Sequence, residues 1–223
     1  MFRAAVFDMD GLLLDSEPLW QQAERTAFGA AGLDLTQRDV CQTIGLRVDE
    51  VVEYWRSRRP WDTNAHPASA VERAIVDEVI ALLGSEAVAL PGVEATIELL
   101  GSQGLRLAVA SSSPLRIIRV TLGALGFSDT FEVVHSAESE PRGKPDPAVY
   151  RTAQARLGVA PAEAFALEDS VAGLHAAQRA GMQCVVVPGA HQRDRPEMQE
   201  AELVLDSMSD FTLAHLVGLA GGA

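Results

Sequence analysis

The sequence predicts an α/β protein in which a doubly wound, Rossmann-like parallel sheet carries an inserted all-helical cap. Short apolar runs recur along the chain without polar alternation, as in strands that are buried on both faces. Segments with the apolar spacing of helices lie between most of these runs. The interval from Asp10 to Leu105 spans about 95 residues, whereas a single strand–helix–strand unit needs only about 30.

The apolar runs are the predicted strands. Their alternation with helical segments is typical of a parallel, doubly wound sheet. In chain order they read "AAVF" (4–7), "LRLAVA" (105–110), "FEVV" (131–134), "AFALE" (164–168), "CVVVP" (184–188) and "LVL" (203–205).

Three further helices are predicted, one just before the second strand and two between later strands. Apolar residues recur at helical spacing from Val93 to Leu100 and again from Leu115 to Leu125. The segment "PAVYRTAQARLG" (147–158) has a similar pattern and ends on Gly158, as helices often do.

The long interval after the first strand reads as helices. Val71, Ile75, Val79 and Leu82 form one apolar stripe, and "LWQQAERTAFGAAG" (19–32) forms another. We therefore predict a core made of residues 1–14 and 88–223, with a helical cap of residues 15–87 inserted after the first strand.

Composition narrows the function classes. The formal net charge is −13, which disfavours a nucleic-acid partner because a phosphate backbone would be repelled. We expect no membrane partner, since no apolar run approaches the roughly 20 residues of a membrane span, and no signal peptide pattern is seen. Two cysteines, Cys41 and Cys184, do not suggest a disulfide framework. The expectation is a cytoplasmic protein, and nothing in the sequence demands more than a monomer.

Polar residues follow four of the predicted strands. In a parallel sheet, ligands bind beyond the carboxyl ends of the strands. We therefore expect these side chains to converge at one edge: Asp8 and Asp10, Ser111 to Ser113, Lys144, and Glu168 with Asp169. Grouped carboxylates suit Mg²⁺, which prefers oxygen ligands and leaves room for a substrate phosphate.

The same residues suggest phosphoryl transfer. A carboxylate beside a metal can attack phosphorus, and a second acid can protonate the leaving alcohol and later activate water. The spacing of Asp8 and Asp10 suits this division of roles. Lys144 is the one lysine beside 17 arginines, and a compact ammonium is not interchangeable with a guanidinium.

Four ordered motifs resemble those of the haloacid dehalogenase superfamily. They are "DMDGLLLDSE", Ser111, Lys144 with Pro145, and "EDS" (168–170). The wider segments "FDMDGLLLDSEPLW", "LPGV", "ASSSP", "KPDPAVY" and "ALEDSVAGL" are similar to the β-phosphoglucomutase-like branch. Within that branch the likeness is greatest to sugar-phosphate phosphatases of the hexitol phosphatase or 2-deoxyglucose-6-phosphatase type.

The resemblance implies catalytic roles for four residues. Asp8 would be the nucleophile, and Asp10 would be the general acid and base. Ser111, together with the amide of Ser112, would hold the phosphoryl group, and Lys144 would neutralise charge between Asp8 and the phosphate.

The resemblance also implies a metal site and a substrate contact. Mg²⁺ would be held by Asp8, by the backbone carbonyl of Asp10 and by Asp169, with Glu168 beside it in support. Arg47, in "GLRVDE", lies where related caps carry an arginine that faces the substrate. The substrate would be a small phosphorylated sugar or polyol.

Single residues disfavour several other enzyme classes of this superfamily. Dehalogenases lack the second aspartate, which is present here as Asp10. Phosphonatases need a cap lysine, and this cap has none. The mutases usually carry a histidine where this chain has Trp20, which favours a phosphatase over a sugar-phosphate mutase. A mutase and a non-catalytic binder of phosphorylated metabolites remain the alternatives.

Overall fold

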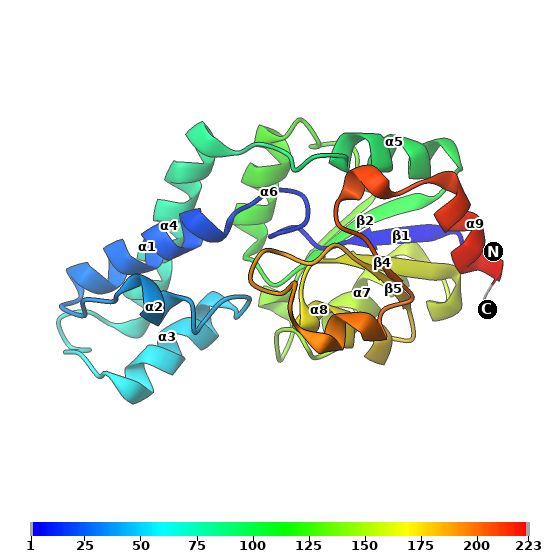
Figure 1. Ribbon diagram of the computed structural model, residues 1–223. Coiled ribbons are helices and arrows are strands. Elements are labelled where there is room, and N and C mark those ends of the chain that lie inside the picture. Colours follow the sequence, from blue (N-terminus) through cyan, green and yellow to red (C-terminus); the bar gives the residue numbers. More distant parts are fainter. Residues whose placement is uncertain (1, 222–223) are drawn as a thin grey trace.

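A computed structural model describes residues 2–221. It consists of a helix-covered sheet and, at one end of that sheet, a separate group of four helices (Figure 1). No helix within the described residues is both long and apolar enough to cross a membrane.

Six parallel strands form the sheet, which confirms the predicted fold class. Their order is β3-β2-β1-β4-β5-β6, so the chain moves outward from β1 in both directions. The strands are β1 (Ala4–Phe7), β2 (Arg106–Ser111), β3 (Val133–Ser136), β4 (Ala164–Glu168), β5 (Gln183–Val186) and β6 (Leu203–Val204).

Helices cover both faces of the sheet because its strands are apolar on both faces. Phe7, Val109 and Leu167 point into a core shared with α5 (Val93–Ser102), α6 (Leu115–Ala124) and α9 (Leu213–Gly221). The opposite face presents small residues such as Ala108 and Ala166. It packs against α7 (Ala148–Leu157) and α8 (Val171–Arg179). The 3₁₀ turns are η1 (Ala137–Ser139), η2 (Pro161–Glu163), η3 (Pro196–Glu200) and η4 (Met208–Asp210).

The strand ends differ slightly from the sequence prediction. β2 continues to Ser111, and β3 begins at Val133 and continues to Ser136. Ser111 and Ser136 pair in the parallel register, so two polar residues extend the ladder past the apolar runs. Backbone pairing rather than side-chain polarity decides where these strands end.

The helical insertion, defined here as residues 17–86, contains the other four helices. They are α1 (Glu17–Ala30), α2 (Gln37–Val40), α3 (Val48–Arg58) and α4 (Ala68–Glu86). Val71, Ile75 and Val79 are buried as expected, but the stripe ends on Leu83 rather than Leu82, which is only partly buried. The reason is the regular spacing of four residues, which keeps Leu83 on the buried face.

The two connections between insertion and core lie side by side. The amide of Leu90 donates to the carbonyl of Leu13 at 2.9 Å, and Leu14 forms an antiparallel bridge with Ala89. This double connection supports our division into a core of residues 1–14 and 88–223 and a cap of residues 15–87, which remains a proposal.

Candidate active site

The strand register brings the predicted residues to one edge of the sheet. Phe7 is level with Val109 on β2 and with Leu167 on β4. Asp8 and Glu168 are each the next residue, so their side chains emerge at the same level between neighbouring strands. Asp8 is 7% exposed and Glu168 is fully buried.

A buried ion-pair network connects Asp8, Lys144 and Glu168. Lys144 Nζ lies 2.8 Å from Asp8 Oδ1 and 2.6 Å from Glu168 Oε1. Tyr150, which is buried on α7, donates its hydroxyl to the same Glu168 oxygen. Glu168 Oε2 accepts hydrogen bonds from the Asp169 amide and the Ser170 hydroxyl, each at 3.2 Å. Both Glu168 oxygens are therefore engaged in holding the network.

The network sets the charge of its members. Burial alone would lower the pKa of Lys144, but the carboxylates of Asp8 and Glu168 outweigh it and raise the pKa above its ordinary value. Burial raises the pKa of Asp8 to about 7 against the opposing charge of Lys144, with Glu168 and Asp10 adding repulsion. The ammonium thus stays charged and partly offsets the burial of the carboxylate that it contacts.

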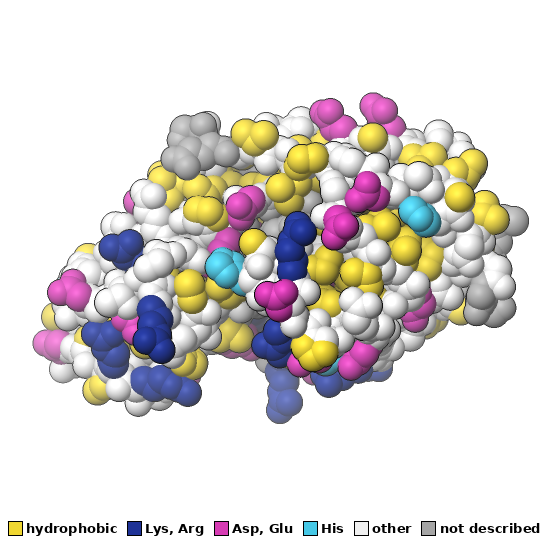
Figure 2. Space-filling view, viewed as in Figure 1, with side chains coloured by type: hydrophobic (Ala, Val, Ile, Leu, Met, Phe, Trp, Pro, Cys, Tyr) yellow, Lys and Arg dark blue, Asp and Glu magenta, His cyan; other side chains and the backbone are white. Residues whose placement is uncertain are grey.

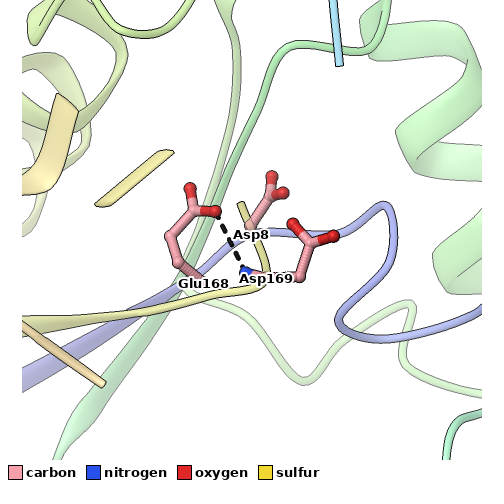
Figure 3. A group of neighbouring side chains, drawn as sticks. All are labelled: Asp8, Glu168 and Asp169. Carbon is pink, nitrogen blue, oxygen red and sulfur yellow. Dashed lines mark hydrogen bonds between the residues drawn. The ribbon is translucent and has the colours of Figure 1, made fainter. Parts of the chain in front are cut away.

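Three acids at this edge can hold a metal ion. Asp8, Glu168 and Asp169 each offer an oxygen within 4.8 Å of the others (Figure 3). Burial, followed by repulsion from Asp8 and Glu168, raises the pKa of Asp169 well above its ordinary value. A divalent cation would oppose both effects, and oxygen ligands are those that hard divalent cations select. The residues present therefore fit a divalent metal.

Glycines shape the space around Asp169. A Cβ atom added at Gly11 would lie 2.1 Å from Asp169 Oδ2, and one added at Gly189 would lie 2.9 Å from the same oxygen. Gly11 also has a φ of +77°, which side chains rarely adopt. The Asp169 carboxylate consequently occupies a slot that only glycine leaves open.

Asp10 is held by four donors from distant parts of the chain. The hydroxyl of Ser16 donates to Oδ1 at 2.5 Å, and the indole of Trp20 donates to the same oxygen at 3.0 Å. Oδ2 accepts from the hydroxyls of Ser113 at 2.6 Å and Ser111 at 3.3 Å. The donors come from the junction, from α1, and from the end of β2 and the loop after it, so Asp10 links the insertion to the core.

Sequence reasoning does not identify three supporting residues: Ser16, Trp20 and Tyr150. Ser113 is expected at this edge of the sheet, but the sequence does not predict its hydrogen bond to Asp10. No local spacing signals their hydrogen bonds, because each partner lies in another motif.

The predicted phosphoryl-binding residues lie beside Asp10. Ser111 is 1% exposed, and its Oγ accepts a hydrogen bond from the Ser113 amide at 3.0 Å. Ser111 and Ser112 both line a cavity between the insertion and the core. Both residues lie just ahead of α6, which begins at Leu115 after Pro114.

Arg47, which was predicted to face the substrate, does not lie at the cavity. Its guanidinium donates to the carbonyls of Ala137 at 2.9 Å and Glu140 at 2.8 Å, and it is paired with Asp49. It is not among the residues that line the cavity. In this structure Arg47 connects the insertion to the loop before Lys144 instead of facing a substrate.

A cavity of about 830 Å³ lies between the insertion and the core, with Asp8, Asp10, Lys144 and Asp169 on its core side. The face in Figure 2 shows basic side chains over the outer part of the insertion and over the middle of the molecule, and acidic side chains spread over both parts. The volume is sufficient for a small phosphorylated molecule.

Comparisons with known proteins agree with this arrangement. The family profile described as "Haloacid dehalogenase-like hydrolase" matches residues 5–187. "Hexitol phosphatase B" of Escherichia coli (strain K12) is 39% identical over 216 residues, covering 96% of this chain and 96% of that protein.

Solved structures share the fold. CbbY from Rhodobacter sphaeroides, solved in complex with phosphate, superimposes with a TM-score of 0.90 at 30% identity, covering 97% of this chain and 100% of the other. β-Phosphoglucomutase from Clostridium difficile has the same fold, with a TM-score of 0.87 at 21% identity, covering 100% and 98% of the two chains.

Proposed function

Because the chain belongs to the haloacid dehalogenase-like hydrolases, we propose that it is a Mg²⁺-dependent phosphatase of small sugar or polyol phosphate monoesters. Substrates of the 2-deoxyglucose-6-phosphate or hexitol phosphate type are favoured by its similarity to hexitol phosphatase B. One observation carries the proposal: the buried Asp8 carboxylate faces the cavity with the Lys144 ammonium 2.8 Å away. That pairing provides a nucleophile together with a cation that can face phosphate oxygens.

The proposed reaction has two steps. An oxygen of Asp8 attacks phosphorus, the bond to the ester oxygen breaks, and Asp10 gives its proton to the departing alcohol. Water then attacks the phospho-aspartyl group, Asp10 takes the proton from that water, and the bond between phosphorus and Asp8 breaks. Inorganic phosphate leaves with both aspartates restored. Ser111 and the Ser112 amide hold the phosphoryl oxygens, and Lys144 offsets their charge.

The metal in this proposal is Mg²⁺. Asp8, Asp169 and the backbone carbonyl of Asp10 would hold it, and Glu168 would act in support through its contacts with Lys144 and the Asp169 amide. When bound, the ion would polarise the phosphoryl group and offset negative charge beside it.

The helical insertion acts as a cap in this proposal. Closure over the cavity would exclude bulk water while the phospho-aspartyl group exists. Arg47 faces the loop before Lys144 in this structure, so its proposed substrate contact requires the guanidinium to leave the carbonyls of Ala137 and Glu140. We propose a monomeric, cytoplasmic enzyme whose partner is a small phosphorylated carbohydrate, without nucleic-acid or membrane partners.

A phosphate-release screen tests the proposal. Purified protein is assayed with sorbitol 6-phosphate, 2-deoxyglucose 6-phosphate and other sugar phosphates, with Mg²⁺ and with EDTA, and the Asp8→Asn variant controls for contaminating phosphatases. Metal-dependent release by the wild type alone is expected. Isomerisation that requires a bisphosphate activator, with little phosphate released, would select the mutase. Binding without release from any ester would select the non-catalytic alternative.

A further inference from the structure

The insertion contributes one wall of the cavity, which carries acidic and hydroxyl-bearing side chains among apolar ones. Among the described residues between 15 and 87, those that line the cavity include no lysine, arginine or histidine. Three of them are acidic: Asp15, Glu17 and Glu24. The basic side chains that line the cavity belong to the core: Lys144, His175, His191, Arg193 and Arg195.

Glu24 is the least expected member of this wall. It is 6% exposed on α1, and its partner Thr43 is 2% exposed. Thr43 Oγ1 lies 3.2 Å from Glu24 Oε2 and 3.0 Å from the carbonyl of Val40. Among the side chains that the structure describes, which exclude those of residues 85 and 86, no other hydrogen bond to the Glu24 side chain is present, and this leaves its Oε1 without a partner at the cavity.

The number of hydrogens available to Glu24 and Thr43 indicates whether the Glu24 carboxyl is protonated or ionised. The Thr43 hydroxyl has one hydrogen and two acceptors within reach. If Glu24 carries a proton, it can donate to Thr43 while Thr43 donates to Val40, and both short contacts are then satisfied. Burial raises the pKa of Glu24 to about 8, with a smaller contribution from repulsion by Glu17, and it outweighs the hydrogen bond from Thr43, which acts in the opposite direction. Both arguments favour a neutral carboxyl.

Glu24 lies about one helical turn beyond the residue that contacts Asp10, the proposed acid of the reaction. Trp20, which bonds to Asp10, lies four residues before Glu24 on the same face of α1. Four residues advance a helix by about 6 Å. Because Asp10 would protonate the leaving oxygen, the remainder of the alcohol would extend from Asp10 along the wall toward Glu24.

We propose that Glu24 and Thr43 form the subsite for hydroxyl groups at the uncharged end of the substrate, and that this wall, which offers no basic side chain to pair with, excludes a second anionic group there. The inference rests on the proposed function and narrows its substrate class to neutral polyol or sugar monophosphates. A buried carboxyl without a cation or a full set of partners costs stability. Hydroxyls of a bound polyol would donate to its free oxygen.

A matched pair of substrates tests the proposal. Sorbitol 6-phosphate and 6-phosphogluconate share one carbon skeleton and differ at the far end, which is a hydroxymethyl group in one and a carboxylate in the other. The wild type should prefer sorbitol 6-phosphate by tenfold or more in kcat/KM. Glu24→Ala should lower kcat/KM for sorbitol 6-phosphate at least tenfold, mainly through KM, and Glu24→Gln should stay within about threefold of wild type.

The control is Glu53→Ala on α3. Glu53 is an exposed acid of the same insertion, is paired with Arg56 and lies outside the cavity lining, so its removal should leave both substrates unaffected. Equal values of kcat/KM for Glu24→Ala and wild type would overturn the inference. Losses of equal size in Glu24→Ala and Glu24→Gln would overturn it too, because a neutral hydrogen-bonding group would then not suffice.

Calorimetry separates this inference from the proposed function. Asp8→Asn and the double variant Asp8→Asn/Glu24→Ala are titrated with sorbitol 6-phosphate, which requires no turnover. Affinity should be at least tenfold weaker in the double variant, even if the wild type releases no phosphate from any ester. Equal affinities would overturn the subsite, and a lack of binding to Asp8→Asn would overturn both the subsite and the proposed substrate class.

Discussion

Replacing Glu24 by glutamine should stabilise the protein in alkaline solution and have little effect in acid. Burial raises the pKa of Glu24 in the folded protein to about 8, from an ordinary value of 4.5. A group with a raised folded pKa contributes its full stability below pH 4.5 and loses it as the pH rises through 8. Glutamine has the same shape and can donate to Thr43, but it has no proton to lose.

The size of the effect follows from the shift. Each unit of the pKa difference between the folded and unfolded protein is worth about 1.36 kcal/mol of unfolding free energy. The wild type can therefore lose at most about 5 kcal/mol as Glu24 ionises. Between pH 5 and pH 9 the expected change is about 4 kcal/mol. A chain of this length gains about 2–4 °C in Tm per kcal/mol. The difference in Tm between Glu24→Gln and wild type should therefore be about 8–16 °C larger at pH 9 than at pH 5.

Thermal melts of both proteins across this pH range provide the measurement. Other groups with raised pKa values, such as Asp8 and Asp169, are common to the two proteins and cancel in the difference. Glu53→Gln, at an exposed position, should give a difference that does not vary with pH. If Glu24→Gln and wild type lose Tm in parallel from pH 5 to pH 9, Glu24 is not a neutral buried acid and the reasoning fails.

Three further substitutions test the site. Asp8→Asn should reduce phosphate release to below about a hundredth of wild type without lowering Tm, and greater residual activity would count against Asp8 as the nucleophile. Lys144→Arg should reduce kcat by at least a hundredfold, because a planar guanidinium cannot fit between two carboxylates that lie 2.8 and 2.6 Å from Nζ; near-normal kinetics would remove Lys144 from the site. Gly11→Ala should raise the Mg²⁺ concentration needed for half-maximal activity at least tenfold, because its Cβ would lie 2.1 Å from Asp169 Oδ2. Gly104→Ala is its control, since Gly104 has the same φ of +77° but no atom near the added Cβ, and equal effects of the two substitutions would point to backbone strain alone.

The positions of the strands were accessible from local sequence because a sheet covered on both faces requires unbroken apolar runs. The run 164–168 corresponds to β4 without any shift, and 4–7 corresponds to β1. Asp8, Lys144 and Asp169 were also accessible, since carboxyl ends of parallel strands meet at one edge. Their catalytic and metal-binding roles remain predictions.

Contacts between the insertion and the core could not be predicted from local sequence. The sequence placed Arg47 in a motif, but a motif does not specify side-chain direction, and the guanidinium binds backbone carbonyls of the loop before Lys144. The hydrogen bonds from Trp20 and Ser113 to Asp10 likewise depend on how α1 and the loop after β2 approach β1.

The sequence by itself determined the order of strands and helices along the chain and the presence of a long helical insertion. It also determined which acids, hydroxyls and single lysine follow the strands. These features depend on local periodicity and on which residue comes next in the chain. Only the tertiary structure decided that Glu24 is buried beside Thr43 and that acids of the insertion line the same cavity as Lys144. Burial and proximity are properties of packed surfaces, and packing joins residues whose separation along the chain carries no signal.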